Sequence, residues 1–141
     1  MQMASSLDIL KQKLIDCEAV KFGNFTLTSG KKSKFYVDMK LASTDPEILS
    51  LIAKEFAKNM PYGIDFIAGM ELGAVPLAVA LSLETGIPYS MIRKSDRKHG
   101  TVSRIEGPNN GNAVLVDDVA TTGGSNIESI KALVDEGVEV T

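Results

Sequence analysis

The spacing of apolar residues changes along the chain, and each spacing predicts a different kind of element. In residues 5–19, apolar side chains recur every three or four positions, at Leu7, Leu10, Leu14 and Cys17. This period predicts an amphipathic helix with serine at its start. Residues 25–28 and 35–39 are short β-prone runs that flank a Ser-Gly-Lys-Lys turn, and together they predict a hairpin.

From residue 44 onward, segments typical of helices and of strands alternate. Thr44 and Glu47 have the spacing of a capping box, and Pro46 falls in the first turn of a helix that we expect to run to about Asn59. Continuous apolar runs predict buried strands at residues 64–69, 88–93, 113–118 and 138–141.

Two more helices are predicted between these strands. Residues 73–86 form an apolar helix with Pro76 near its start and Gly86 as its stop. Residues 125–137 form the other, with Ser125 and Glu128 again at capping-box spacing and a glycine at the end.

This alternation of strands and helices predicts an α/β domain, in which a parallel twisted sheet has helices on both faces. We expect a single domain over residues 1–141, with an N-terminal part, 1–42, and a core, 43–141. A domain of this design usually continues past a strand such as 138–141, so we expect that C-terminal material is missing here.

Composition and charge narrow the class of protein. Hydrophobic residues make up 44% of the chain and charged residues 23%, which is ordinary for a globular protein. A net charge of −3 gives the chain as a whole no electrostatic basis for binding nucleic acid or an anionic membrane. No apolar run approaches the roughly 18 residues of a membrane span. With one cysteine and no signal-peptide pattern, we expect a cytoplasmic protein.

Candidate chemistry gathers in the sequence VLVDDVATTGGS, residues 114–125. Asp117 and Asp118 follow a predicted strand, and a loop rich in threonine and glycine leads into a predicted helix. Free amides at a helix N-terminus favour a phosphate group. The two carboxylates would repel a phosphate alone, but they suit a ligand that carries hydroxyl groups or Mg²⁺ beside its phosphate, such as a ribose 5-phosphate. The alternative is that the acids only end a strand and the glycines only make a turn.

The same run resembles the phosphoribosyl pyrophosphate (PRPP) signature of the type I phosphoribosyltransferases. The resemblance implies the fold of that family and PRPP binding by Asp117, Asp118, Val119, Ala120, Thr121, Thr122, Gly123, Gly124 and Ser125.

The sequence AVKFGNFTLTSGKKSKFYVDMK, residues 19–40, is similar to the N-terminal signature of the orotate phosphoribosyltransferases. That resemblance implies that Lys21 meets PRPP, that Phe35 and Tyr36 border the orotate ring, and that residues 1–42 form a hood over the base. The residues alone equally allow a solvated lysine and a strand whose alternate side chains pack in the core.

Residues 93–104 concentrate positive charge in an acidic chain, at Arg93, Lys94, Arg97, Lys98, His99 and Arg104. A long basic loop beside a phosphate site is typical of a lid that closes on a polyanion. The loop resembles the catalytic loop of the orotate phosphoribosyltransferases. The match implies that Arg93, Lys94, Arg97 and His99 contact pyrophosphate, with Lys98 also at the substrate. In that family the loop reaches the partner subunit's site, which implies a homodimer. Apart from the resemblance, His99 could be a bystander.

Residues 68–78 end one predicted strand and open the next helix, which makes a second anion site. In the superfamily this loop holds pyrophosphate, often through an unusual peptide geometry, which implies a binding role for Glu71, Leu72 and Gly73. A carboxylate such as Glu71 suits that place only if it turns away or lies on Mg²⁺.

The resemblance therefore implies an enzyme that makes orotidine 5′-monophosphate and pyrophosphate from orotate and PRPP. We expect Lys94, Arg97, His99 and Asp118 to be catalytic, Mg²⁺ to be the cofactor, held mainly through PRPP, and no nucleic acid or membrane partner. Two alternatives are a type I enzyme for a purine base and a PRPP-sensing regulator without catalysis. In family members an arginine beyond this point contacts the orotate carboxylate, and no residue of 1–141 is assigned to it.

Overall fold

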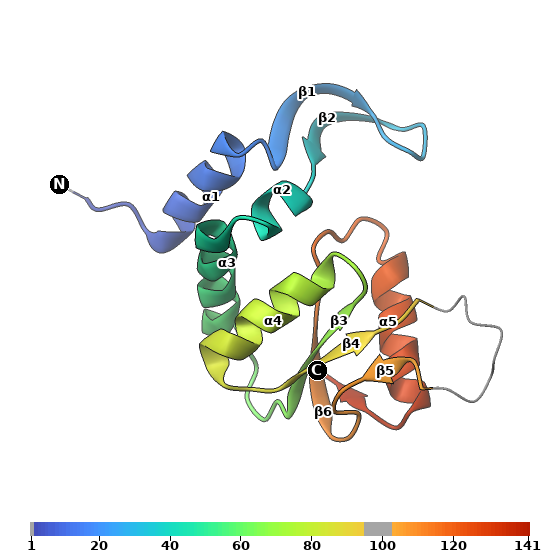
Figure 1. The fold of residues 1–141 in the computed structure, drawn as a ribbon. Helices are drawn as coiled ribbons and strands as arrows, with labels where there is room; N and C mark the ends of the chain where they lie inside the picture. The colour runs from blue at the N-terminus through green and yellow to red at the C-terminus, as the bar shows by residue number, and fades with distance from the viewer. Residues whose placement is uncertain (1, 95–102) are drawn as a thin grey trace.

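The computed structural model describes residues 2–94 and 103–141 (Figure 1). Its helices are α1 (Ser6–Asp16), α2 (Lys40–Ser43), α3 (Pro46–Lys58), α4 (Ala74–Thr85) and α5 (Gly124–Asp135). Its strands are β1 (Val20–Thr26), β2 (Lys32–Val37), β3 (Phe66–Met70), β4 (Tyr89–Ile92), β5 (Ile105–Glu106), β6 (Asn112–Val116) and β7 (Glu139–Val140).

Five strands form the main sheet in the order β5-β4-β3-β6-β7. β3 pairs in parallel with β4 and with β6, and β6 pairs in parallel with β7, so the predicted parallel sheet is confirmed. β5 is the exception, because it runs antiparallel to β4. The sequence did not predict β5, since two paired residues inside a segment rich in glycine, asparagine and charge leave no apolar run.

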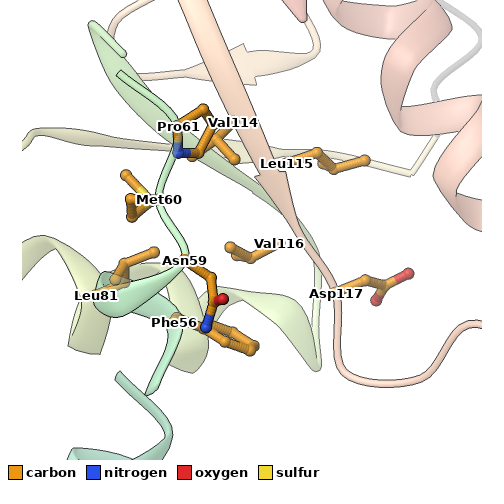
Figure 2. A pocket seen from close by; sticks show the side chains of 9 residues that line it. All are labelled: Phe56, Asn59, Met60, Pro61, Leu81, Val114, Leu115, Val116 and Asp117. Carbon is orange, nitrogen blue, oxygen red and sulfur yellow. The ribbon is translucent and has the colours of Figure 1, made fainter. Parts of the chain in front are cut away.

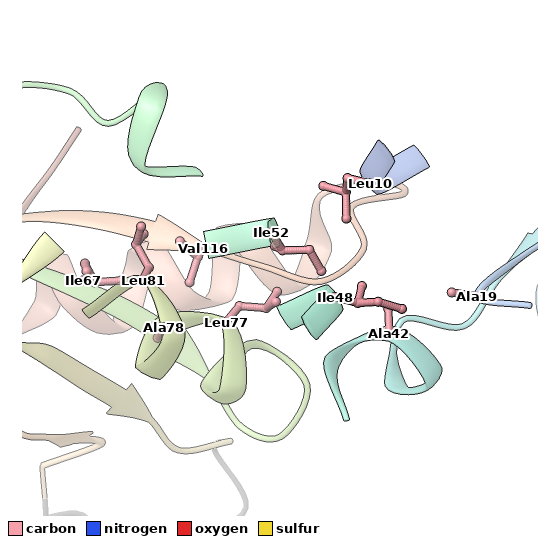
Figure 3. Close-up of a cluster of buried hydrophobic side chains, with 10 residues drawn as sticks. All are labelled: Leu10, Ala19, Ala42, Ile48, Ile52, Ile67, Leu77, Ala78, Leu81 and Val116. Carbon is pink, nitrogen blue, oxygen red and sulfur yellow. The ribbon is translucent and has the colours of Figure 1, made fainter. Parts of the chain in front are cut away.

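Helices cover both faces of the sheet, as predicted, and neighbouring residues of β3 pack toward opposite sides. Ile67 belongs to a buried cluster with α4, α3 and Val116 of β6 (Figure 3). Phe66 and Ala68 belong to a second cluster, which Leu133 of α5 completes. The side chains of Phe66, Ile67 and Ala68 are all fully buried. Burial of a large apolar side chain contributes about 1.5–3 kcal/mol, so the central strand is firmly placed between its two layers.

Two of the predicted helix caps are wrong. α3 is capped by Asp45, whose carboxylate accepts a hydrogen bond from the Ile48 amide at 3.0 Å. Thr44 instead donates its hydroxyl to the Lys40 carbonyl at 2.6 Å and so closes the short helix α2. α5 begins after Gly123, without a side-chain cap, one position before Ser125. Spacing alone does not decide between adjacent capping candidates.

The N-terminal part consists of α1, the β1–β2 hairpin and α2. α1 packs on α3, where Lys13 and Glu47 form an ion pair at 3.0 Å. The predicted hairpin is confirmed, but β1 begins at Val20, earlier than its apolar residues indicated. Figure 1 shows the hairpin beyond the end of the sheet at which α4 and α5 begin.

Candidate functional site

The carboxyl ends of three adjacent strands meet at one edge of the main sheet. Met70 of β3 lies beside Ile92 of β4, and Gly69 lies beside Val116 of β6. The chain leaves these strands at Glu71, at Arg93 and at Asp117. Parallel sheets place ligands at this edge, since helix N-termini also open there. The predicted site segments 71–73, 93–94 and 117–125 are thus brought together by strand pairing.

Asp117 and Asp118 stand at the end of β6, and both are half-buried. The Asp118 amide donates to the Asp117 carboxylate at 2.8 Å, and the Val119 amide donates to the Asp118 carboxylate at 2.9 Å. Burial raises the pKa of the Asp117 carboxyl above its ordinary value, and the neighbouring Asp118 carboxyl adds to the rise. This pair of acceptors is suited to hydroxyl groups, which donate to carboxylates.

The loop after the acids is exposed and ends in a helix N-terminus. Thr121 and Thr122 are exposed, and Gly123 has a φ of 82°, in the left-handed region that glycine tolerates best. Because no side chain caps α5, the amides of its first turn are available to an anion. The chain from Val119 to Ser125 therefore presents amides and hydroxyls at the positive end of the helix dipole.

The loop between β3 and α4 approaches the acids from the neighbouring strand. The Glu71–Leu72 peptide bond is cis, which matches the unusual peptide geometry expected there. Leu72 is exposed, and α4 begins after Gly73 without a side-chain cap, which gives a second open helix N-terminus. A Cβ atom added to Gly73 would collide with the Asp118 carboxylate, so this glycine lets the two loops close on each other.

The Glu71 carboxylate points toward the end of β4. Its Oε1 accepts a hydrogen bond from the Lys94 amide at 2.6 Å. The carboxylate is thus engaged by backbone, which reduces its repulsion of an anion on the loop amides. The Lys94 side chain is exposed, and Arg93 pairs through Nε with Glu106 at 2.8 Å. The remaining basic residues expected to act here, Arg97, Lys98 and His99, lie outside the described residues.

The hairpin exposes its aromatic residues. Phe35 and Tyr36 are 55% and 45% exposed, so the alternative that they pack in the core is wrong. Tyr36 lies opposite Lys21 in the strand register, and Phe35 lies opposite Phe22. Residues directly opposite each other share a face, whereas neighbours along a strand point to opposite faces. Lys21 and Tyr36 therefore share one face of the hairpin, and Phe35 lies on the other.

A hollow of about 220 Å³ lies between the end of α3 and β6 (Figure 2). Its lining is mainly apolar, with Phe56, Met60, Leu81, Val114 and Val116 among its residues. Asp117 lies at one end of the hollow, and Figure 2 shows its carboxyl directed away from the apolar side chains. Such a lining does not suit a polyanion, whereas the two loops present hydrogen-bond donors.

Sequence reasoning missed the polar contacts that hold β5 to α5. Arg104, counted only as one charge of the basic segment, bonds to Glu128 of α5 at 2.9 Å and to the Arg93 carbonyl. Glu128 was expected to cap its own helix. These contacts join residues 11 and 24 positions apart, so no local pattern predicts them.

Comparison with known proteins shows the class of protein to which this fold and site belong. The phosphoribosyl transferase domain family matches residues 45–141, and the chain belongs to that family. The orotate phosphoribosyltransferase of Thermoplasma volcanium is 52% identical over 134 residues, which cover 94% of this chain and 79% of that protein. That of Methanopyrus kandleri is 45% identical over 139 residues, with 98% and 75% covered.

A solved structure agrees with these relatives. The crystal structure of orotate phosphoribosyltransferase from Aeropyrum pernix superposes with a TM-score of 0.80 at 33% identity, with 93% of this chain and 76% of that one covered. Within its family, the chain belongs with the orotate phosphoribosyltransferases. The resemblance found in the sequence and the expected fold are therefore confirmed.

Two further features concern metals and membranes. Within residues 2–94 and 103–141, side chains of His, Cys, Asp and Glu do not gather in threes that could hold a metal ion. Over the same residues, each helix is too short or too polar to cross a bilayer.

Proposed function

We infer that the protein transfers the phosphoribosyl group of PRPP to orotate, giving orotidine 5′-monophosphate and pyrophosphate in pyrimidine biosynthesis. The observation that carries this inference is the meeting of two open helix N-termini and a pair of carboxylates at one edge of the sheet. PRPP has two anionic ends joined by a ribose, and the site offers amide donors for each anionic end and carboxylate acceptors for the ribose hydroxyls.

The 5-phosphate lies on the loop from Val119 to Ser125. Amides and the hydroxyls of Thr121, Thr122 and Ser125 surround it, and the dipole of α5 favours its charge. The ribose hydroxyls then fall beside Asp117 and Asp118, where the carboxylates accept hydrogen bonds from them. This placement fixes the ribose on both sides of its reacting carbon.

The pyrophosphate lies on the loop of Glu71, Leu72 and Gly73, beside Lys94. In the reaction, the bond between the anomeric carbon and a pyrophosphate oxygen breaks, a ring nitrogen of orotate bonds to that carbon, and the proton of that nitrogen passes to the departing pyrophosphate. Positive charge develops on the ribose while negative charge grows on the leaving group. Amides of the loop and the basic side chains of Arg93 and Lys94 stabilise that negative charge. Arg97, Lys98 and His99 are proposed to assist them.

Mg²⁺ is the proposed cofactor. The ion commonly binds one or two carboxylates together with substrate phosphates, and it demands few protein ligands. We propose that the ion is held mainly through PRPP, because Asp117 and Asp118 accept the ribose hydroxyls. When bound, the ion withdraws charge from the leaving group.

The hairpin residues Lys21, Phe35 and Tyr36 are proposed to meet PRPP and the orotate ring. Their exposure leaves them available to a ligand. The protein is further proposed to act as a cytoplasmic homodimer, in which the basic loop 93–104, whose two ends are anchored in its own chain, reaches the partner's site.

A turnover assay tests the function directly. The purified chain is given PRPP and Mg²⁺ with orotate, adenine, guanine or uracil, and pyrophosphate release is measured. We expect pyrophosphate release when the base is orotate and none when it is adenine, guanine or uracil. Release with a purine would favour the purine enzyme, and PRPP binding without release for any base would favour the regulator.

A further inference from the structure

Arg104 joins α5 to the end of β4 without belonging to either anion-binding loop. Its Nη2 donates to Glu128 Oε1 at 2.9 Å, and its Nε and Nη2 donate to the Arg93 carbonyl at 3.0 and 2.9 Å. The side chains of Arg104 and Glu128 are 30% and 43% exposed, so the pair is partly shielded from solvent. The forked guanidinium binds a carboxylate of α5 and a backbone carbonyl of the β4 end at once, which a lysine could not do in the same way.

The contact continues to the pyrophosphate loop through the backbone. The Arg93 amide donates to the Arg104 carbonyl at 2.8 Å, which extends the β4–β5 ladder by one residue beyond Ile92. The next amide, that of Lys94, donates to Glu71. A continuous series of hydrogen bonds therefore runs from α5 through Arg104 and residues 93–94 to the loop that follows β3.

α5 also holds this segment at its other end. Glu136, which caps the C-terminus of α5, accepts from the Ser103 hydroxyl at 2.7 Å and from the Arg104 amide at 3.3 Å. The Asn109 side chain donates to the same carboxylate at 3.4 Å. Residues 103–104 are thus fixed to both halves of the helix whose N-terminus receives the phosphate.

We propose that Arg104 is a positioning residue, which holds the Lys94 backbone in register between the phosphate-binding helix and the pyrophosphate loop. The proposal rests on the proposed function, because it assigns Lys94 to the leaving group. Arg104 itself touches no substrate in this account. Its role is to fix the backbone from which the Lys94 side chain extends toward the leaving group.

The first test is a double-mutant cycle between Arg104→Met and Lys94→Ala, assayed by orotate-dependent pyrophosphate release. We expect Arg104→Met alone to lower kcat roughly 10- to 100-fold, as for a small misplacement of a catalytic group, with KM for PRPP little changed. In the Lys94→Ala background the same substitution has little further effect, because the residue that it positions is gone. Independent, multiplying losses would contradict the proposal.

The second test does not depend on activity. Hydrogen exchange of the Lys94 amide, bonded to Glu71, is measured in the wild-type protein, in Arg104→Met and in the milder Arg104→Lys. We expect faster exchange in both variants, with the smaller change in Arg104→Lys. Lys13→Met is the matched control, since Lys13 is similarly shielded, at 33% exposure, in an ion pair with Glu47 far from this edge.

The outcomes separate this proposal from the function. A wild-type protein without orotate turnover contradicts the proposed function, while the exchange experiment still decides the role of Arg104. An unchanged Lys94 amide in both Arg104 variants would overturn the positioning role, whatever the activity. Equal acceleration in Lys13→Met would overturn it as well, because the effect would then be general loosening of the fold.

Discussion

The loop from Val119 to Ser125, here called the phosphate loop, and the β1–β2 hairpin both supply residues to the proposed site. The two regions are held in different ways. The loop follows β6, which lies between β3 and β7 and packs on helices through Ala113 and Val116. The hairpin pairs only within itself, and it leaves Phe22 71% exposed beside Phe35. A loop anchored in a packed sheet is preorganised for one ligand shape, whereas an exposed hairpin gains its order from what it covers.

Under the proposed function, the two regions contact different parts of the substrates. The sheet edge carries hydrogen-bond donors for anions and acceptors for hydroxyl groups. PRPP contains both kinds of group, in its phosphates and in its ribose. The hairpin carries aromatic area, which suits a flat base. Substitutions in the two regions should therefore separate PRPP binding from orotate binding.

The largest effect is expected at the phosphate loop. Replacing Thr121 and Thr122 together by leucine removes two hydroxyl donors and fills the space beside the α5 N-terminus. PRPP affinity, measured by calorimetry, should be lost, roughly 100-fold or more when two donors to a charged group are removed. Thermal unfolding should change little because both threonines are exposed. Unchanged PRPP affinity would place the phosphate elsewhere.

Gly73→Ala should give the next largest effect. The new Cβ collides with the Asp118 carboxylate, which lies at the end of a side chain and can move aside. We expect kcat/KM for PRPP to fall about tenfold, as for a misplaced binding group, with a small change in Tm. A large loss of Tm with normal kcat/KM in the folded fraction would show that the glycine serves packing alone.

A smaller and different effect is expected on the hairpin. Tyr36→Leu should raise KM for orotate several-fold, by about 1 kcal/mol for a lost aromatic contact, and leave KM for PRPP unchanged. Phe22→Leu is the matched control, because Phe22 is exposed on the face opposite Lys21 and Tyr36 and is not proposed to contact a substrate. Equal effects of the two substitutions would contradict the assignment of Tyr36 to the base.

The smallest effect concerns pH and stability. The folded-state pKa of Asp117 is raised above its ordinary value of 3.8, so the folded protein binds this proton more tightly than the unfolded chain. The contribution of the Asp117 carboxyl to the free energy of unfolding is therefore fully present below pH 3.8. It declines as the pH rises through the raised pKa of the folded state. Asp117→Asn should remove that decline and increase Tm slightly at neutral pH. A lower Tm at neutral pH would show that the charged carboxylate stabilises the fold.

The sequence predicted those elements whose pattern is local. The apolar run and Gly86 define α4, and the continuous apolar strands define the parallel sheet. Both predicted capping boxes failed because Asp45 and Gly123 compete one or two positions away, and only the backbone decides between them.

The features of the site that the sequence did not predict depend on contacts between residues that are far apart in the chain. Gly73 and Asp118 approach each other only because β3 and β6 are neighbours in the sheet. The contact of Arg104 with Glu128 depends on β5, which was not predicted. The pattern of residues 117–125 predicted an anion-binding loop, but strand pairing determines what faces it.

A crystal structure with bound orotidine 5′-monophosphate tests the central claim most directly. We predict the 5′-phosphate on the amides and hydroxyls of residues 119–125, with the ribose hydroxyls on Asp117 and Asp118 and the base beneath the hairpin. A nucleotide bound on another surface, with the end of β6 free of it, would contradict the account.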